Sequence, residues 1–291
     1  MQAIDDYIKN VRYLPPAPRV VPDLMKLLNQ ENVDSSRVVR MVSLDPSLTA
    51  NVLRLCNSAY FAAATPTTDL QEAVTRLGFR QVYQLVTAAT GAKLLTTPSK
   101  GYGMDPGELW KHSVAAAIAA QLMARKLHED ENQVFTAALL HDIGKVILSQ
   151  AVEDSYDKIF REAEIHQISI LECEKKVLGV NHAEVGGRLL EKWKFPNNVI
   201  AAVAHHHSPR GARQHERLAS FVYLGNMIAY FMGHGFGHIA FAMRGREEAL
   251  SILGLAPESV PQFMMETFEQ MNVIDALFSL TAEPETKTPG K

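Results

Sequence analysis

Residues 132–150 read NQVFTAALLHDIGKVILSQ, a run apolar enough to predict one helix that is buried on nearly all sides. His141 and Asp142 interrupt the run, Gly144 indicates that the helix loosens there, and Lys145 follows directly. An imidazole beside a carboxylate can share a divalent metal, and a nearby lysine can hold an anion. The stretch therefore predicts both a core helix and a polar site within it.

The sequence around this run also has helical periodicity. Apolar residues over 48–59 fall on one helical stripe after the start signal at Asp45, and similar signals stand at Asp34 and Asp69. No set of alternating strands accompanies them. The sequence therefore predicts an all-α fold.

Residues 96–107 (TTPSKGYGMDPG) form the clearest internal boundary because they are rich in glycine, proline and small polar residues. Residues 1–95 read as a bundle of four or five short helices. An alanine-rich helix is predicted from Glu108 to about Leu127. The boundary thus predicts a linker between two helical parts.

The C-terminal part reads as an extension followed by a tail. An amphipathic segment over 260–280 is expected to pack its apolar face on the core through Phe263, Met264, Phe268 and Met271. The polar residues 281–291 contain two prolines and are predicted to be disordered.

Composition narrows the functional classes. The net charge of −3 gives no general attraction to nucleic acid or to an anionic membrane. No apolar run reaches the roughly 18 residues that span a bilayer, and the start MQAIDDYIKN lacks the apolar core of a signal peptide. Cys56 and Cys173 are expected to be buried, reduced thiols. These features predict a cytoplasmic protein.

The histidines fall into two sets. His112 stands four residues after Glu108 on one helical face, an arrangement typical of metal ligands, and further imidazoles follow at His182, His206 and His207. With His141 and Asp142 they would suit one or two ions of Fe, Mn or Zn. The alternative for His141-Asp142 is a buried, hydrogen-bonded pair that ties helices together. Ordinary core, surface or loop positions are expected for His128, His166, His205, His215, His234 and His238.

Residues from about 14 to 209 resemble the HDOD domain, a relative of the HD and HD-GYP metal-dependent phosphohydrolases. The resemblance rests on blocks in the family's order: LPPAPRVVPDLMKLLN, LDPSLTANVLRLCNSAYF, AVTRLGFRQV, LWKHSVAAAIAAQLMA, LLHDIGKVIL, GVNHAEVGGRLLEKW and FPNNVIAAVAHHHSP. It implies an N-terminal helical part (1–95) packed, through the linker 96–107, on an HD-like helical part (108–214), with an extension over 215–280.

The resemblance also implies site residues. The metal ligands of the HD-GYP enzymes fall on Glu108, His112, His141, Asp142, His182, His206 and His207. Lys145 matches the lysine that contacts substrate phosphate. The final aspartate ligand falls on Asn226, and the Gly-Tyr-Pro segment is absent, since residues 208–216 read SPRGARQHE. An amide brings no charge and accepts no proton from a metal-bound water.

Two functions follow from this comparison. The first is a non-catalytic bacterial signalling module that keeps a metal-binding pocket and acts through a partner protein or a small phosphate-containing ligand. The alternative is a metal-dependent phosphohydrolase or phosphodiesterase acting on a nucleotide or cyclic dinucleotide, with His141, Asp142 and Lys145 as its catalytic residues. Nucleic-acid and membrane binding rank last because no basic patch or spanning segment is present.

Overall fold

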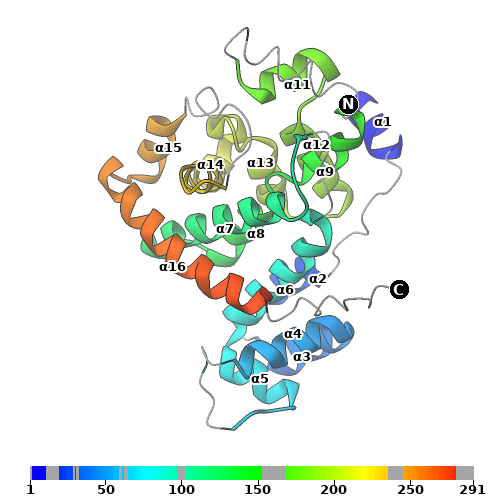
Figure 1. Ribbon diagram of the computed structural model, residues 1–291, viewed down its shortest axis with the longest axis vertical. Helices are drawn as coiled ribbons and strands as arrows, with labels where there is room; N and C mark the ends of the chain where they lie inside the picture. Colours follow the sequence, from blue (N-terminus) through cyan, green and yellow to red (C-terminus); the bar gives the residue numbers. More distant parts are fainter. Residues whose placement is uncertain are drawn as a thin grey trace, which may run out of the picture.

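The computed structural model describes residues 2–10, 20–28, 30, 33–58, 61, 65–96, 102–152, 165, 168–234 and 245–279. Over these residues the chain forms helices and no strand, which confirms the all-α class (Figure 1). The α-helices are α1 (Gln2–Asn10), α2 (Val20–Leu28), α3 (Ser35–Ser43), α4 (Pro46–Cys56), α5 (Leu70–Leu77), α6 (Phe79–Leu95), α7 (Glu108–Lys126), α8 (Glu131–Leu140), α9 (Ile143–Val152), α11 (Ile170–Leu178), α12 (His182–Lys192), α13 (Asn197–Ala204), α14 (Glu216–Phe231), α15 (Arg246–Leu253) and α16 (Val260–Ser279). Two short 3₁₀ helices are η2 (Pro209–His215) and η4 (Pro257–Ser259).

Helices α3, α4 and α5 pack together at one end of the molecule (Figure 1). Each begins at a predicted aspartate whose carboxylate accepts hydrogen bonds from backbone amides of the first turn: Asp34, Asp45 and Asp69. These caps satisfy donors that a helix start leaves without partners in the helix. The starts of these three helices therefore lie where the local sequence signals predict them.

Helix α6 joins this end to the rest of the molecule. The hydroxyl of Tyr83 on α6 shares a hydrogen bond with the hydroxyl of Thr136 on α8, and both side chains are buried. Helix α6 ends at Leu95 and α7 begins at Glu108, the two edges of the expected linker. The division of the chain into domains stays a prediction.

Helices α7 and α14 pack closely and position part of the site. The alanines along α7 are buried, and a Cβ placed on Gly225 of α14 would lie 2.4 Å from the carbonyl oxygen of Ala116. Small residues on both helices therefore permit the approach of the two backbones. Helix α7 carries His112, and α14 carries Asn226 and Tyr230.

The prediction of one continuous helix over 132–150 is wrong. The run divides into α8 and α9, with His141 and Asp142 at the junction. Gly144 explains why the chain turns there: its backbone lies against α12, and a Cβ on it would come within 1.9 Å of the carbonyl oxygen of His182. Tertiary packing thus interrupts an apolar pattern that otherwise continues.

We expect Gly144→Ala to lower the free energy of unfolding by at least about 1–3 kcal/mol, because the added methyl group meets a backbone atom that cannot move away. Urea denaturation measures this change. Gly245→Ala is the matched control, since its Cβ would meet only the Tyr223 side chain, at 3.3 Å. Equal stability of Gly144→Ala and the wild type would show that the α8–α9 junction is not held against α12.

The expectation for the C-terminal segment holds for most of its apolar face. Phe263 and Met271 of α16 are buried, and Met264 packs against the core. Phe268, however, is 61% exposed, so its predicted packing is wrong. The buried stripe of α16 repeats at spacings of three and four residues and consists of Val260, Phe263, Thr267 and Met271. Phe268 comes one position after Thr267 and therefore falls outside this stripe.

Two expectations from composition can be compared with the described residues. Cys56 and Cys173 are both buried and neither forms a disulfide, as expected. None of the described helices combines the length and the apolar character that crossing a lipid bilayer requires. The predicted tail 281–291 lies outside the described residues.

Candidate metal centre

The structure brings six of the predicted ligands to one buried region from different elements. His112 comes from α7, His141 and Asp142 from the α8–α9 junction, His182 from the first position of α12, and His206 and His207 from the turn after α13. They form two groups in which the ligating atoms lie within 4.8 Å of one another. Residues far apart in the sequence therefore converge as their spacing indicated.

The first group is His112, His141 and Asp142. The two Nε2 atoms of the histidines are 3.2 Å apart. The Asp142 Oδ2 atom lies 3.5 Å from Nε2 of His112 and 3.3 Å from Nε2 of His141. All three side chains are buried. Two imidazoles and one carboxylate oxygen thus face a common point.

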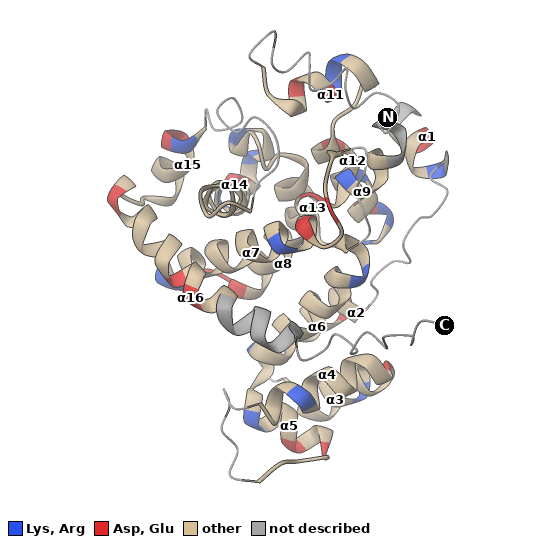
Figure 2. Cartoon of the chain, viewed as in Figure 1, with Lys and Arg blue, Asp and Glu red and all other residues tan. Residues whose placement is uncertain are grey.

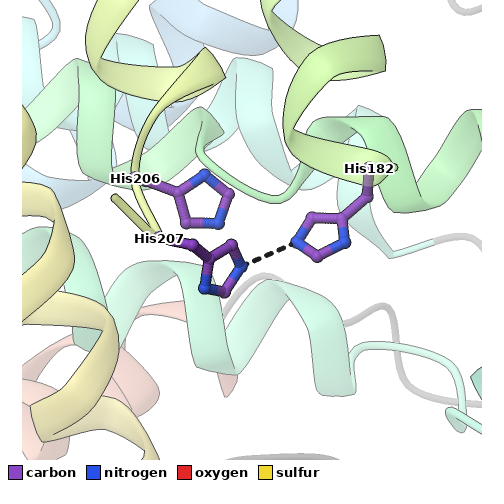
Figure 3. Close-up of side chains that lie close together, drawn as sticks. All are labelled: His182, His206 and His207. Carbon is purple, nitrogen blue, oxygen red and sulfur yellow. Dashed lines mark hydrogen bonds between the residues drawn. The ribbon is translucent and has the colours of Figure 1, made fainter. Parts of the chain in front are cut away.

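The second group is His182, His206 and His207, shown in Figure 3. Nε2 of His182 lies 3.0 Å from Nε2 of His207. Asp142 Oδ1 lies 3.3 Å from Nε2 of His182 and 3.8 Å from Nε2 of His206. Asp142 therefore turns one carboxylate oxygen toward each group.

The opposite ring nitrogen, Nδ1, fixes the orientation of four of these histidines. In His112, Nδ1 donates to the carbonyl oxygen of His234 at 2.6 Å. In His141 and His206 it donates to the carbonyl oxygens of Ala138 (2.6 Å) and Val203 (2.7 Å), respectively. In His182 it donates to the Glu174 carboxylate at 2.8 Å. Carbonyl and carboxylate oxygens only accept, so we assign the proton of each neutral ring to Nδ1. Each Nε2 then offers a lone pair to the centre, as in metal-ligating histidines.

Burial keeps three of the rings neutral. It lowers the pKa of His112 to about 3 and lowers the pKa values of His206 and His207 well below the ordinary value. Burial alone would raise the pKa of Asp142, but the charged groups around it, the Lys145 ammonium among them, outweigh burial and hold that pKa well below its usual value. The centre therefore combines three neutral imidazoles with an ionised carboxylate.

Two buried atoms of the groups, Asp142 Oδ1 and His206 Nε2, have no hydrogen-bond partner among the described residues. Asn226 Oδ1 on α14 is a further buried atom without one. With both Nδ1 atoms protonated, the Nε2 atoms of His112 and His141 also face each other as acceptors. Leaving a buried acceptor unpaired costs about 1–3 kcal/mol, and a cation between the groups would satisfy Asp142 Oδ1 and His206 Nε2. The donor set fits a divalent ion, since imidazole suits Zn and Fe and carboxylate suits Mn.

Lys145 is held inside the centre. Its Nζ donates to Asp142 Oδ2 at 2.6 Å, and the side chain is almost fully buried. Burial alone would lower the pKa of Lys145, but the Asp142 charge outweighs it and raises that pKa. The lysine thus remains charged and neutralises Asp142.

The remaining predicted positions lie differently. Glu108 belongs to neither group, and its carboxylate accepts a hydrogen bond from the backbone amide of Asp105 at 2.7 Å. Asn226 is buried with 6% exposure. His205 belongs to neither group and is half-buried, and His234 follows the end of α14. His128 is exposed, His215 is half-buried, and His166 and His238 lie outside the described residues. The ligand role of each predicted residue stays a prediction.

Sequence reasoning missed two residues behind the centre, Glu174 and Tyr102. Glu174 accepts one hydrogen bond from Nδ1 of His182 and another from the hydroxyl of Tyr102. A glutamate on a short amphipathic helix is ordinarily a solvated surface group, and a tyrosine among glycines reads as part of a linker. The available signal was the place of Glu174 next to Cys173, a residue expected to be buried.

Comparisons with known proteins agree with this architecture. A protein from Marinobacter aquaeolei VT8, described as a candidate signal transduction protein, superposes with a TM-score of 0.75 at 24% identity, over 97% of this chain and 65% of that one. An uncharacterized protein of Treponema pallidum (strain Nichols) is 24% identical over 222 residues, 75% of this chain and 42% of the relative. Ribonuclease Y of Geobacillus thermodenitrificans (strain NG80-2) is 37% identical over 97 residues, 33% of this chain and 14% of that enzyme.

The chain spans less than half the length of these curated relatives. The family model of the HDOD domain matches residues 14–209, the same range in which the sequence blocks resemble that domain. The match covers more than half of the chain and includes all six residues of the two groups. The chain therefore belongs to the HDOD domain family.

Proposed function

We propose that the chain is a regulatory HDOD module of the bacterial cytoplasm whose buried centre binds one or two divalent ions without turning over a substrate. The single observation that carries the proposal is the orientation of four imidazoles, each with its Nδ1 proton donated outward and its Nε2 lone pair facing the Asp142 carboxylate. A buried, hydrogen-bonded pair that only ties helices together would place donors opposite acceptors, whereas with the protons assigned to Nδ1 acceptors face acceptors.

The residues would divide between two ions. His112 and His141 would hold one ion, while His182, His206 and His207 would hold the other, and Asp142 would contribute an oxygen to each. A bound ion would supply positive charge to the centre and link α7, the α8–α9 junction, α12 and α13. We infer that the occupied centre stabilises one arrangement of these helices, which a signalling partner then recognises.

Two features support a regulatory role over catalysis. Lys145, the match to the phosphate-contacting lysine, has its ammonium group bonded to Asp142. The centre is also closed, since of the six converging residues only His207 is more than marginally exposed. A phosphate ester would need both a free cation and an open approach to the ions.

The second candidate is a metal-dependent phosphohydrolase or phosphodiesterase. It is favoured by the position of Asp142 between the two groups, since paired ions joined by a carboxylate can hold phosphate and activate water. Ribonuclease Y, a relative over part of the chain, bears the name of a phosphodiester-cleaving enzyme. In this reading His141 and Asp142 would hold the ions, and Lys145 would contact phosphate. Basic and acidic residues are interspersed over the described helices (Figure 2), which favours a nucleotide over a nucleic acid as substrate.

Metal analysis combined with an activity assay tests both candidates. We expect the purified wild-type protein, loaded with Mn²⁺ or Zn²⁺, to bind one or two ions per chain and to leave a cyclic dinucleotide and a nitrophenyl phosphodiester intact. His141→Ala removes a ligand itself, so it should lower metal affinity by more than the about 10–100-fold that loss of a residue orienting a ligand costs. His128→Ala, which changes an exposed histidine, should bind metal as the wild type does.

Each outcome separates the readings. A wild-type protein that binds no ion would refute the metal centre altogether. Metal-dependent hydrolysis that His141→Ala abolishes would establish the phosphohydrolase in place of the regulatory module.

A further inference from the structure

Helix α11 carries Glu174, a carboxylate that is fully buried behind the second group of histidines. Its Oε2 atom accepts two hydrogen bonds from His182, one from the backbone amide at 2.7 Å and one from Nδ1 of the ring at 2.8 Å. Its Oε1 atom accepts from the hydroxyl of Tyr102 at 2.8 Å. Three donors from two segments thus hold one carboxylate in place.

No lysine or arginine in the described part of the chain forms an ion pair with Glu174. Lys145 is bonded to Asp142, and the ion pair of Glu174 is with His182, a residue that is charged only when protonated. Isolated buried carboxylates are costly, so nearby positive charge is favoured. An ion at Nε2 of His182 would supply that charge across the imidazole ring.

Tyr102 sets the orientation of the carboxylate. Its ring is buried, and burial together with the neighbouring Glu174 raises the pKa of the phenol well above the ordinary tyrosine value. The hydroxyl therefore keeps its proton and donates a hydrogen bond to Glu174. Tyr102 precedes α7 by six positions, so this bond also ties the segment before α7 to α11.

We infer that Glu174 and Tyr102 are positioning residues for the metal centre: Glu174, oriented by Tyr102, fixes the Nδ1-protonated form of His182 and strengthens its Nε2 as a ligand. A carboxylate behind a metal-bound histidine restrains the ring and raises the basicity of the ligating nitrogen. The inference rests on the proposed metal-binding function for its effect on affinity, while the fixed form of His182 exists with or without an ion.

The first experiment measures Zn²⁺ and Co²⁺ affinity of the full chain by chelator competition. Glu174→Gln keeps the shape and removes the charge, and we expect it to weaken binding by about 10–100-fold. Tyr102→Phe removes one hydrogen bond and should weaken binding in the same direction by a smaller factor. Glu184→Gln is the matched control, because Glu184 lies in the first turn of α12, two positions after His182, but bonds to Lys175 and Asn181. It should bind both ions as the wild type does.

The second experiment records the ¹⁵N resonances of the His182 ring in metal-free protein. We expect the wild type and Glu184→Gln to show a protonated Nδ1, and Glu174→Gln to show a mixture of the two neutral forms, since an amide can donate as well as accept. The absorption bands of the Co²⁺-loaded protein should shift in Glu174→Gln and Tyr102→Phe only.

The results distinguish failure of this inference from failure of the metal centre. A wild type that binds metal, with Glu174→Gln and Tyr102→Phe of unchanged affinity, overturns the inference and leaves the metal centre standing. A wild type that binds no metal refutes the proposed function, and the His182 resonances then decide the inference alone. If Glu174→Gln does not fold, Tyr102→Phe decides it by the same two measurements.

Discussion

Replacing Asp142 by asparagine is expected to lower the free energy of unfolding by about 3–5 kcal/mol and to reduce bound metal to background. Asp142 is 1% exposed and accepts a hydrogen bond from Nζ of Lys145 at 2.6 Å. The substitution leaves the Lys145 ammonium buried without its counter-charge. It also removes the carboxylate that faces both groups of histidines. Urea denaturation and elemental analysis of the purified variant measure the two effects.

A double variant separates these effects. Asp142→Asn combined with Lys145→Met leaves neither charge buried, so it should recover much of the lost stability, because replacing both partners of a buried pair is far less costly than removing one. It should still lack metal, since the shared carboxylate is absent. Full metal content in Asp142→Asn would contradict the role of Asp142 as a ligand of both ions.

The sequence predicts best those parts of the fold that local chemistry determines. The starts of α3, α4 and α5 follow from aspartates that cap their own helices, and such a cap needs only the residues next to it. For the break between α8 and α9, the sequence offered only Gly144 as a sign that the helix loosens. The apolar pattern continues through it, and the chain turns because Gly144 lies against the backbone of His182, 38 positions later in the sequence.

The candidate site shows the same division. Spacing and the family resemblance identified the histidines that converge on Asp142, because imidazoles are uncommon enough for their positions to be informative. Glu174 was missed, since nothing local distinguishes a buried glutamate from a solvated one on an amphipathic helix. Its hydrogen-bond partner Tyr102 comes from a segment that reads as a linker. Partners of this kind become visible only when distant segments are placed together.

Asn226→Asp is expected to destabilise the metal-free protein and to increase the stabilisation that metal provides. Asn226 occupies the position of the family's final aspartate ligand, is 6% exposed, and has an Oδ1 atom without a hydrogen-bond partner among the described residues. A carboxylate there adds an unpaired buried charge, whose cost is several kcal/mol in the absence of a counter-ion. A divalent ion in the centre would offset that cost. The affinity for a second ion should therefore rise at least about tenfold, which corresponds to about 1.4 kcal/mol.

The measurement is the melting temperature of the wild type and of Asn226→Asp, each with a chelator and with saturating Mn²⁺ or Zn²⁺, together with the number of ions bound. Asn132→Asp is the matched control, because its amide oxygen also lacks a partner but belongs to the first turn of α8 and to neither metal group. The control should respond to metal as the wild type does. If Asn226→Asp gains no more stabilisation from metal than the control, the amide does not face the ions, and its presence at the aspartate position then carries no information about catalysis. If it gains a second ion and also acquires hydrolytic activity, the regulatory module differs from an enzyme by the charge of one side chain.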